Sequence, residues 1–454
     1  MAEVTVPAST DRSMRRLWRK VGIRIIPLIG IAYVMSYIDR ANLGYMAVPL
    51  SKDLGISGSQ MGLASGLFFI GYVLVEVPSN MMLRRFGARR WITRILVTWG
   101  AVTMATAAVQ NVGQLYVMRI LLGFAEAGLA AGILLYLTGW FPRRYRAWAL
   151  SAFFMMIPLS GIIGSPLAAA LLSWGQSLTG LAGWRSLFLV EGAITLLAGI
   201  LVFTMLPDRP RDAKWLTTVE KEAIERRLAQ ETSEQEARGA LSSVRQALTS
   251  ARVWTLALAF FAIVFGLYPI AFFLPTMIST LTGSVSGMSN VSSVLLAGIP
   301  SAFAIIAMAV WPKVASGMSA VSATVIPMGV GIVGLVTATF THDNVIFIAS
   351  FCLSVSGIYT AMPQFWRLPP LSLTGAAAAS GIAVINSVSN ISGFVGPYFT
   401  GFIADTTGSY TYALLTIALI LVAGAAILLT AGRKAEHDGT SRQVLQPSEK
   451  EKIA

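Results

Sequence analysis

The chain is poor in the residues that build disulfide frameworks and metal centres. Its 454 residues include one cysteine and two histidines. Cys352 alone cannot form an internal disulfide or a site with several thiolate ligands, and neither His342 nor His437 has further ligands at metal-binding spacing. The sequence also carries no motif that pairs a nucleophile with a base. We therefore expect a protein that is not an enzyme and that needs no metal or other cofactor.

Charge is also scarce. Charged residues make up 12% of the chain and hydrophobic residues 55%, with a mean hydropathy of +0.69, whereas soluble domains carry about 25% charged residues. This composition predicts a polytopic membrane protein. The net charge of +13 does not indicate a nucleic-acid partner, because lysine and arginine lie in short segments between apolar runs, as membrane topology requires.

Apolar runs long enough to cross a bilayer recur along the chain. A hydrocarbon core about 30 Å thick requires roughly 20 apolar residues per helix, and twelve such spans are predicted. They cover residues 24–50, 61–83, 91–109, 114–138, 147–173, 184–206, 252–281, 289–311, 319–340, 345–366, 376–404 and 408–432. The N-terminus, MAEVTVPASTDRSMRRLWRK, has no apolar core followed by a cleavage site, so the first span is expected to be retained.

These spans predict an all-α integral membrane fold of two six-helix bundles, at residues 24–206 and 252–432. A charged loop at 207–251 joins the bundles, and its middle reads as a short solvated helix. A cytoplasmic segment, 1–23, precedes the first bundle. The polar tail, 433–454, is expected to be disordered.

Cations predict the orientation, because short cytoplasmic loops retain lysine and arginine. One side carries Arg12, Arg15, Arg16, Arg19, Lys20, Arg84, Arg85, Arg89, Arg90, Arg143, Arg144 and Arg146. The other side of the same half offers only Lys52 and Arg185. Both termini and the central loop are therefore expected on the cytoplasmic side of a bacterial inner membrane.

The two halves share an internal pattern. PLSGIIGSPLAAALL at 158–172 and NISGFVGPYFTGFIA at 390–404 lie in the fifth span of each half, and both contain Ser-Gly-x-x-Gly followed closely by proline. This pattern indicates duplicated bundles, as in the parallel repeats of transporters. Glycine permits close helix contact and proline bends helices, which suits a helix that moves against its neighbours.

Ionisable residues inside the predicted spans are the candidates for function. A charge at the bilayer centre costs at least about 2.5–3.5 kcal/mol, so it faces protein or water. Asp39 and Arg40 lie in the first span and Arg119 and Glu126 in the fourth. Arg119 and Glu126 are seven residues apart and so share a helix face, at about 10 Å. Asp39 and Glu126 lie at similar depths, which places all four around one cavity near the midplane.

These four residues combine permanent and titratable charge. Arginine keeps its proton and matches a carboxylate with a fixed fork of donors, so Arg40 and Arg119 are predicted to bind an anionic substrate. Asp39 and Glu126 are predicted to carry protons. A bound anion and a carboxylate compete for the same arginine, so protonation and anion binding should favour each other. The alternative is a structural bridge, with Asp39 and Arg119 simply pairing to lock the helices.

Other polar and aromatic residues complete the prediction. The predicted substrate-binding set also includes Tyr37, Tyr72, Phe154, Tyr359, Trp366, Asn386 and Asn390. The two asparagines lie one turn apart and can hydrogen-bond a carboxylate or hydroxyl, whereas Trp366 is equally consistent with an interfacial belt. Glu76 is compatible with a structural or a functional role, Glu191 is expected to brace the sixth span, and Arg367 to snorkel to the interface.

Five long motifs carry a family resemblance. They are SYIDRANLGYM, GYVLVEVPSNMMLRRFGARRW, RILLGFAEAGLAAG, DRPRDAKWL and FWRLPPLSLTGAAAASGIAVINSVSNISGFVGPYFTGFIADTTGSY. Together they resemble the anion:cation symporter family of the major facilitator superfamily, in its branch of tartrate, phthalate and 4-hydroxyphenylacetate permeases. The resemblance implies proton roles for Asp39 and Glu126, substrate roles for Arg40 and Arg119, and a site that includes Trp366 and Asn386.

One segment departs from this family. Where relatives carry a Ser-Asp-Arg loop after the eighth span, this chain has WPKVASGMSAVSA. The resemblance implies that this loop normally latches the second bundle on the cytoplasmic side, so looser conformational control is expected there.

The leading hypothesis is therefore a monomeric, proton-coupled importer of a small organic carboxylate, aromatic or a compact dicarboxylate, with the bilayer, protons and substrate as its partners. An antiporter of organic anions or phosphate esters is the alternative within transport, although the titratable pair Asp39 and Glu126 weighs against it. A membrane sensor without flux is the alternative of another class.

Overall fold

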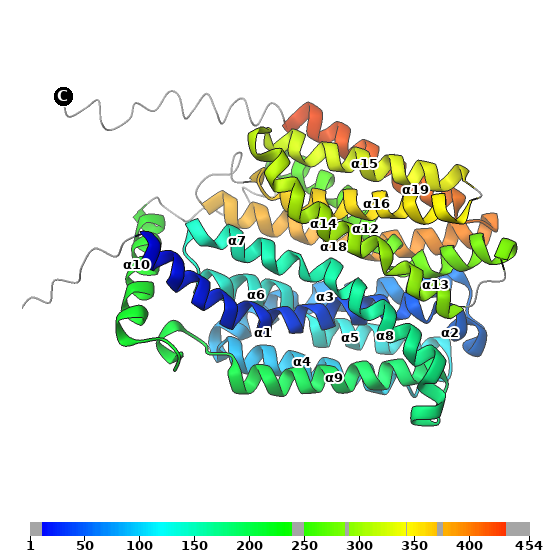
Figure 1. The fold of residues 1–454 in the computed structure, drawn as a ribbon, viewed down its shortest axis with the longest axis horizontal. Helices are drawn as coiled ribbons and strands as arrows, with labels where there is room; N and C mark the ends of the chain where they lie inside the picture. The colour runs from blue at the N-terminus through cyan, green and yellow to red at the C-terminus, as the bar shows by residue number, and fades with distance from the viewer. Residues whose placement is uncertain (1–10, 238–248, 287–289, 342, 370–375, 433–454) are drawn as a thin grey trace, which may run out of the picture.

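The protein consists of long helices that run side by side along one axis (Figure 1). The computed structural model describes residues 11–237, 249–286, 290–341, 343–369 and 376–432, and no strand occurs in these segments. His342, His437 and the tail 433–454 lie outside them. The helices of the first half are α1 (Asp11–Tyr45), α2 (Ala47–Leu54), α3 (Gly58–Phe86), α4 (Ala88–Thr106), α5 (Val112–Glu126), α6 (Leu129–Thr138), α7 (Arg143–Phe154), α8 (Met156–Thr179), α9 (Gly183–Met205) and α10 (Thr218–Ala237). Those of the second half are α12 (Ala251–Ser286), α13 (Asn290–Ala297), α14 (Ile299–Val314), α15 (Ala320–Phe340), α16 (Asn344–Phe365), α18 (Ala376–Thr407) and α19 (Thr411–Ile427).

Every predicted span coincides with a helix or a pair of helices. Ten helical segments of the described chain are long and apolar enough to cross a membrane. The spans predicted at 91–109 and 376–404 correspond to α4 and α18, which are not among those ten. Helix α4 carries three arginines in its sequence, ARRWITRILVTWGAVTMAT, which lower its hydropathy. The predicted all-α membrane fold is confirmed.

Three spans that were expected to be continuous are broken near their middles. The fourth span divides into α5 and α6, the fifth into α7 and α8, and the eighth into α13 and α14. The first of these breaks lies at Ala127 and Gly128, directly after Glu126, and Gly128 adopts a φ of 86°. A left-handed residue of this kind ends a helix and favours glycine.

The central loop contains the expected helix, α10, but one side of it is not solvated. Ile224 on α10 is fully buried, and Glu220 lies 2.7 Å from Lys20 of α1. Glu231 at the far end of α10 lies 3.9 Å from Arg146 of α7. These contacts hold α10 against the first half of the chain. We call this end of the molecule the α10 end and the opposite end, where α2 lies, the α2 end (Figure 1).

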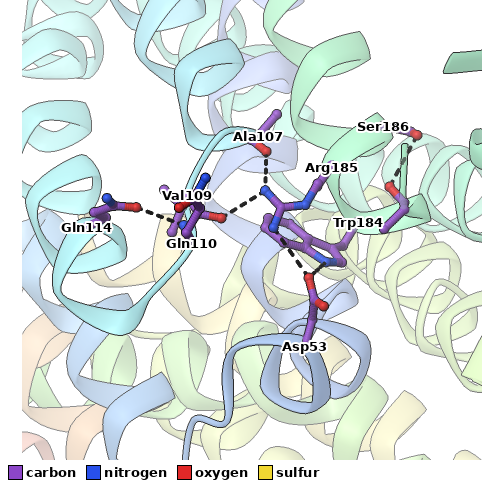
Figure 2. A network of polar contacts seen from close by, with 9 residues as sticks. Asp53, Ala107, Val109, Gln110, Gln114, Trp184, Arg185 and Ser186 are labelled. Atoms are coloured by element: carbon purple, nitrogen blue, oxygen red, sulfur yellow. Dashed lines mark hydrogen bonds and ion pairs between the residues drawn. The ribbon is translucent and has the colours of Figure 1, made fainter. Parts of the chain in front are cut away.

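At the α2 end, a polar network joins three segments of the first half (Figure 2). Arg185 of α9 donates to the carbonyl oxygens of Ala107 and Val109, at 2.7 and 2.8 Å, in the turn that follows α4. It also lies 3.4 Å from Asp53 of α2, which accepts a hydrogen bond from Trp184 at 3.0 Å. Arg185 therefore connects α9 to α2 and to the turn after α4, a structural role that the sequence did not indicate.

The two halves approach each other closely at the α2 end. Gly62 of α3 packs against the backbone of Pro397 of α18, and Gly401 of α18 packs against Gly58. The carboxylate of Asp405 accepts hydrogen bonds from the backbone N–H groups of Gly58 and Ser59, at 2.9 and 2.6 Å. An acidic side chain of one half thus caps a helix of the other, where backbone donors and the helix dipole both favour negative charge.

The repeated glycine motif occupies equivalent positions in the two halves. A Cβ at Gly161 of α8 would meet Ser301 of α14, and a Cβ at Gly393 of α18 would lie 2.5 Å from the ring of Phe69 of α3. The first glycine of each motif therefore faces the opposite half. The second glycine packs on the first long helix of its own half, Gly164 against Ile38 and Gly396 against Pro269. This symmetry supports a duplicated origin for the halves.

We predict that Asp405→Asn loosens the contact at the α2 end. Burial raises the pKa of the Asp405 carboxyl, but hydrogen bonds from Ser59, Ser57 and Gly58 outweigh it and leave the pKa below its ordinary value. A lowered pKa means that the stabilisation is present above the unperturbed value, about pH 3.9, and is lost as the pH falls through the lowered value. At neutral pH the cap is therefore fully charged, and its removal should raise the ratio of molecules with this contact broken to molecules with it formed by about two- to fivefold.

The measurement is the distance between spin labels at Lys52 and Thr407, in a Cys352→Ser background, by pulsed electron resonance. Asp343→Asn is the matched control, because Asp343 caps α16 through Val345 and Ile346 within its own half. An unchanged distance distribution in Asp405→Asn would contradict the assignment.

Candidate functional site

A cluster of buried ionisable residues lies inside the first half of the chain. Asp39 and Arg40 of α1, Arg119 and Glu126 of α5, and Glu191 of α9 are all at most 8% exposed. Apolar side chains surround the cluster, so each charge must be balanced by a neighbour or by a proton. The structure therefore brings together the four charged residues that the sequence selected, and it adds a fifth.

The strongest contact of the cluster is an ion pair between Glu126 and Arg40. One oxygen of Glu126, Oε1, accepts hydrogen bonds from Nη2 and Nε of Arg40 at 2.5 and 3.0 Å. The same oxygen accepts from the hydroxyl of Ser36 at 2.6 Å. The other oxygen, Oε2, has no hydrogen-bond partner. The pair joins α1 to α5 by charge-assisted hydrogen bonds, which are stronger than neutral ones.

Aromatic rings enclose the guanidinium of Arg40. Its Cζ lies 5.2 Å from the ring centre of Tyr37, 5.0 Å from that of Phe68 and 5.3 Å from that of Tyr72. These distances allow cation–π attraction, which is strongest where water is excluded. Tyr37 and Tyr72, predicted as substrate contacts, thus lie around the predicted anion-binding arginine.

Arg40 also reaches the second half of the chain. Its Nη1 donates to the hydroxyl of Tyr268 on α12 at 3.2 Å. The ion pair of α1 and α5 is therefore connected to the opposite half through one hydrogen bond. The same guanidinium therefore bonds to Glu126 within the first half and to Tyr268 of the second half.

Asp39 does not form the ion pair with Arg119 that the sequence analysis considered as the alternative, structural role. No pair within 4 Å joins the two side chains among the described residues, and Nη1 and Nη2 of Arg119 have no hydrogen-bond partner. Oδ1 of Asp39 instead accepts hydrogen bonds from Thr103 of α4 at 2.8 Å and from Asn42 at 3.2 Å, and its Oδ2 has no partner. The sequence analysis did not select Thr103 or Asn42, because neither residue is charged.

Arg119 holds an unusual position for a buried cation. Its Nε donates to the carbonyl oxygen of Ala64 at 3.2 Å, whereas Nη1 and Nη2 have no hydrogen-bond partner. The guanidinium lies over the ring of Phe68, with Cζ 5.3 Å from the ring centre. Buried donors without partners are costly. Two adjacent donors of one arginine match the two oxygens of a carboxylate, so Arg119 has the chemistry of an anion anchor.

The helix break after Glu126 is stabilised from α3. Ser79 donates its hydroxyl to the carbonyl oxygen of Ala127 at 2.7 Å and accepts from Nε1 of Trp91 at 3.0 Å. A Cβ at Gly128 would collide with Ser79. The break places Glu126 at the last position of α5, where the helix dipole disfavours negative charge. This makes Glu126 more dependent on Arg40.

The predicted residues of the second half do not contact the charged cluster through any hydrogen bond or ion pair of the described chain. Tyr359 lines a small cavity of about 50 Å³, which Tyr37, Tyr45, Ser160 and Ser301 also border. Phe154, a predicted residue at the end of α7 in the first half, lines a second, smaller cavity together with Tyr359. The structure therefore places these two predicted residues on internal space between the halves.

The other three predicted residues of the second half do not line these two cavities. Trp366 packs edge to face on Phe260, with ring centres 4.9 Å apart. Asn390 of α18 donates to Glu76 of α3 at 3.5 Å, the outer limit of a hydrogen bond. Asn386 is half-buried. Among other residues considered from the sequence, Arg367 is exposed, and it donates to the carbonyl oxygen of Met318 in the loop after α14 at 3.4 Å.

Comparisons with known proteins identify the family. The model of the Major Facilitator Superfamily matches residues 29–397. A putative tartrate transporter of Agrobacterium vitis is 39% identical over 94% of both chains. A quinolone resistance transporter of Acinetobacter baumannii is 34% identical over 94% of this chain and 98% of its own. The inward-facing, unoccupied crystal structure of a bacterial homologue of the human lysosomal transporter Spinster aligns with a TM-score of 0.72 at 18% identity, covering 93% of this chain and 98% of that one.

The chain therefore belongs to the Major Facilitator Superfamily. It is a multi-pass membrane transporter rather than an enzyme, and the predicted resemblance to an anion-transporter branch of this superfamily is confirmed. The likeness to the solved structure establishes the fold alone.

We predict that Ser79→Ala destabilises the helix break. The carbonyl oxygen of Ala127 and Nε1 of Trp91 would both lose a partner, which should cost about 1–3 kcal/mol of unfolding free energy. Thermal unfolding of the purified protein, followed by tryptophan fluorescence, should show a lower midpoint. Thr204→Ala is the control, because Thr204 is exposed and bonds only to its own helix. Equal midpoints for both variants would show that Ser79 does not support the break.

Proposed function

We propose that the protein is a monomeric, proton-coupled symporter that imports a small organic carboxylate by alternating access. The observation that carries the proposal is the buried pair of Glu126 and Arg40. Here a titratable acid occupies the donors of an arginine that could bind an anion. The same arginine also contacts Tyr268 of the opposite half.

Competition for Arg40 supplies the coupling. While Glu126 is ionised, it accepts hydrogen bonds from Nε and Nη2 of Arg40. These two donors are then not available to a substrate carboxylate. Protonation removes the charge that holds the pair together, and a substrate carboxylate can then take its place. Proton binding therefore raises the affinity for the anion, and anion binding raises the affinity for the proton, by the same free energy.

Two arginines give the substrate two points of attachment. Arg119 presents Nη1 and Nη2 without partners, and Arg40 becomes available when Glu126 is protonated. A dicarboxylate or an aromatic carboxylate would satisfy both cations with its charge and pack against Tyr37, Tyr72 and Phe154. The proposed substrate-binding residues are Arg40, Arg119, Tyr37, Tyr72, Phe154, Tyr359, Trp366, Asn386 and Asn390, and the proposed proton-carrying residues are Asp39 and Glu126.

The membrane potential favours a proton-coupled route. An inside-negative potential opposes entry of an anion by about 2.3 kcal/mol per charge per 100 mV. Two protons that enter with one monoanion reverse this sign, and Asp39 and Glu126 are two acids that can carry them.

We further propose that the α10 end faces the cytoplasm and the α2 end faces the outside. The arginine-rich segments of the first half support this orientation, because cytoplasmic loops retain cations. The described contacts of Asp405 with α3, and of Gly62 with α18, close the α2 end. The six-helix bundles 24–206 and 252–432 would be the units that rock.

The substrate class follows from chemistry and from one relative. The name of the Agrobacterium vitis protein points to tartrate, a compact dicarboxylate. The aromatic residues of the proposed site equally suit a benzoate-like acid. The name of the Acinetobacter baumannii protein instead links that transporter to quinolone resistance. An antiporter is the second candidate function.

Uptake competition in proteoliposomes tests the substrate class. Under an imposed proton gradient, tartrate, phthalate or hydroxyphenylacetate should drive or inhibit uptake more strongly than sugar acids or phosphate esters. Preferential competition by phosphate esters, or transport that requires a counter-substrate, would favour the antiporter.

We predict that Glu126→Gln abolishes accumulation against a gradient but retains exchange of labelled substrate. The amide cannot exchange a proton, but it leaves Arg40 free to bind the anion. Initial rates of gradient-driven uptake and of counterflow separate the two processes, with Glu222→Gln on the exposed face of α10 as the control. Undiminished uphill uptake in Glu126→Gln would remove this residue from the coupling role.

A further inference from the structure

A third buried acid is linked to Asp39 through a single asparagine side chain. Glu191 of α9 is 0% exposed. Its Oε2 accepts a hydrogen bond from Nδ2 of Asn42 at 2.9 Å, and the same nitrogen donates to Oδ1 of Asp39 at 3.2 Å. One neutral amide therefore bridges two buried carboxyl groups. The proposed transport mechanism does not use Glu191.

Glu191 has no balancing cation within 4 Å among the described residues. The titratable groups whose charges act on it include Asp39 and Tyr45 of α1. The neighbouring helix α4 meets this part of α9 through Gly100 and Met104. The sequence of α8 contains no titratable residue. Arg185, on the same helix as Glu191, is engaged with Ala107, Val109 and Asp53 at the α2 end (Figure 2).

Two atoms without partners indicate where a proton lies. Oδ1 of Asn42 is a buried acceptor with no donor, and Oε1 of Glu191 is a buried oxygen with no partner. A carboxylate offers no hydrogen, whereas a protonated carboxyl offers one O–H donor. An amide and a carboxylic acid can satisfy each other with two hydrogen bonds, one in each direction. A proton on Glu191 would therefore supply a donor for the orphaned amide oxygen.

The charges of the cluster lead to the same assignment. Two ionised acids that share one neutral amide repel each other, and burial without a cation adds to the cost. Asp39 has a hydroxyl donor in Thr103 and lies in the field of Arg119, whereas Glu191 has only the amide. The negative charge is therefore better placed on Asp39 and the proton on Glu191.

We propose that Glu191 retains a proton and acts as a positioning residue, fixing Asn42 so that its nitrogen donates to Asp39. Resting on the proposed function, this assigns a third acid to the proton-coupling site. Asp39, Asn42 and Glu191 form one unit that holds a single proton and a single charge. Loss of the Glu191 carboxyl would free Asn42 to turn and would weaken the support of ionised Asp39.

Infrared spectroscopy of the purified protein tests the protonation state without any transport assay. At neutral pH the wild type should show the carbonyl band of a protonated carboxyl. The band should be lost in Glu191→Gln and retained in the control Glu222→Gln. An identical band in both variants would overturn the proposal.

The pH dependence of uptake tests the positioning role. Glu191→Met keeps a similar volume but removes both hydrogen bonds, so ionised Asp39 loses support, and the pH midpoint of gradient-driven uptake should rise by about one unit. Glu191→Gln retains an acceptor and a donor for Asn42 and should restore the wild-type midpoint. Equal midpoints in Glu191→Met and wild type, or a failure of Gln to restore the midpoint, would overturn the role.

The two sets of outcomes separate this inference from the proposed function. If the infrared band depends on Glu191 but uptake shows no proton coupling, then the symporter proposal fails and the protonated Glu191 stands. If uptake is proton-coupled but the band is indifferent to Glu191, then the inference fails and the symporter proposal stands.

Discussion

The pairing of Arg40 with Glu126 is the interaction on which the proposed mechanism depends. A guanidinium and a carboxylate are buried together, and neither is stable there alone. Ser36, Tyr37 and Tyr72 enclose the pair, and Tyr268 joins it to the other half. In the proposed mechanism one arginine serves both an acid and an incoming anion, so that the state of one proton would govern both substrate affinity and a contact between the halves.

The surrounding fold keeps this pair in position. Ser79 and Gly128 form the break that ends α5 at Glu126, and Arg185 ties the ends of α2, α4 and α9 together. These contacts support the local structure of the first half around its buried charges. Small residues such as Gly62 and Gly401 line the contact between α3 and α18 and let the two helix backbones approach closely.

The fold could be predicted from the sequence because apolar runs long enough to cross a bilayer are easy to detect. The four charged residues could be selected because ionisable side chains are rare within such apolar runs. The sequence did not predict which charges pair. Asp39 bonds to Thr103 and Asn42 rather than to Arg119. The spacing of residues along one helix does not reveal how that helix is rotated about its axis relative to its neighbours. Helix breaks such as that at Ala127 were missed because an apolar run continues through them. The sequence indicated only a bracing role for Glu191 and gave no sign of its contact with Asn42, which lies 149 positions away in the chain.

The most direct test of the central claim is proton uptake upon substrate binding. Purified protein should be titrated with the transported carboxylate by calorimetry in buffers of different ionisation enthalpy, near neutral pH. The account predicts that binding takes up protons from solution, and that Glu126→Gln reduces this uptake. Anion binding without any proton uptake in the wild type would contradict the competition between Glu126 and substrate for Arg40.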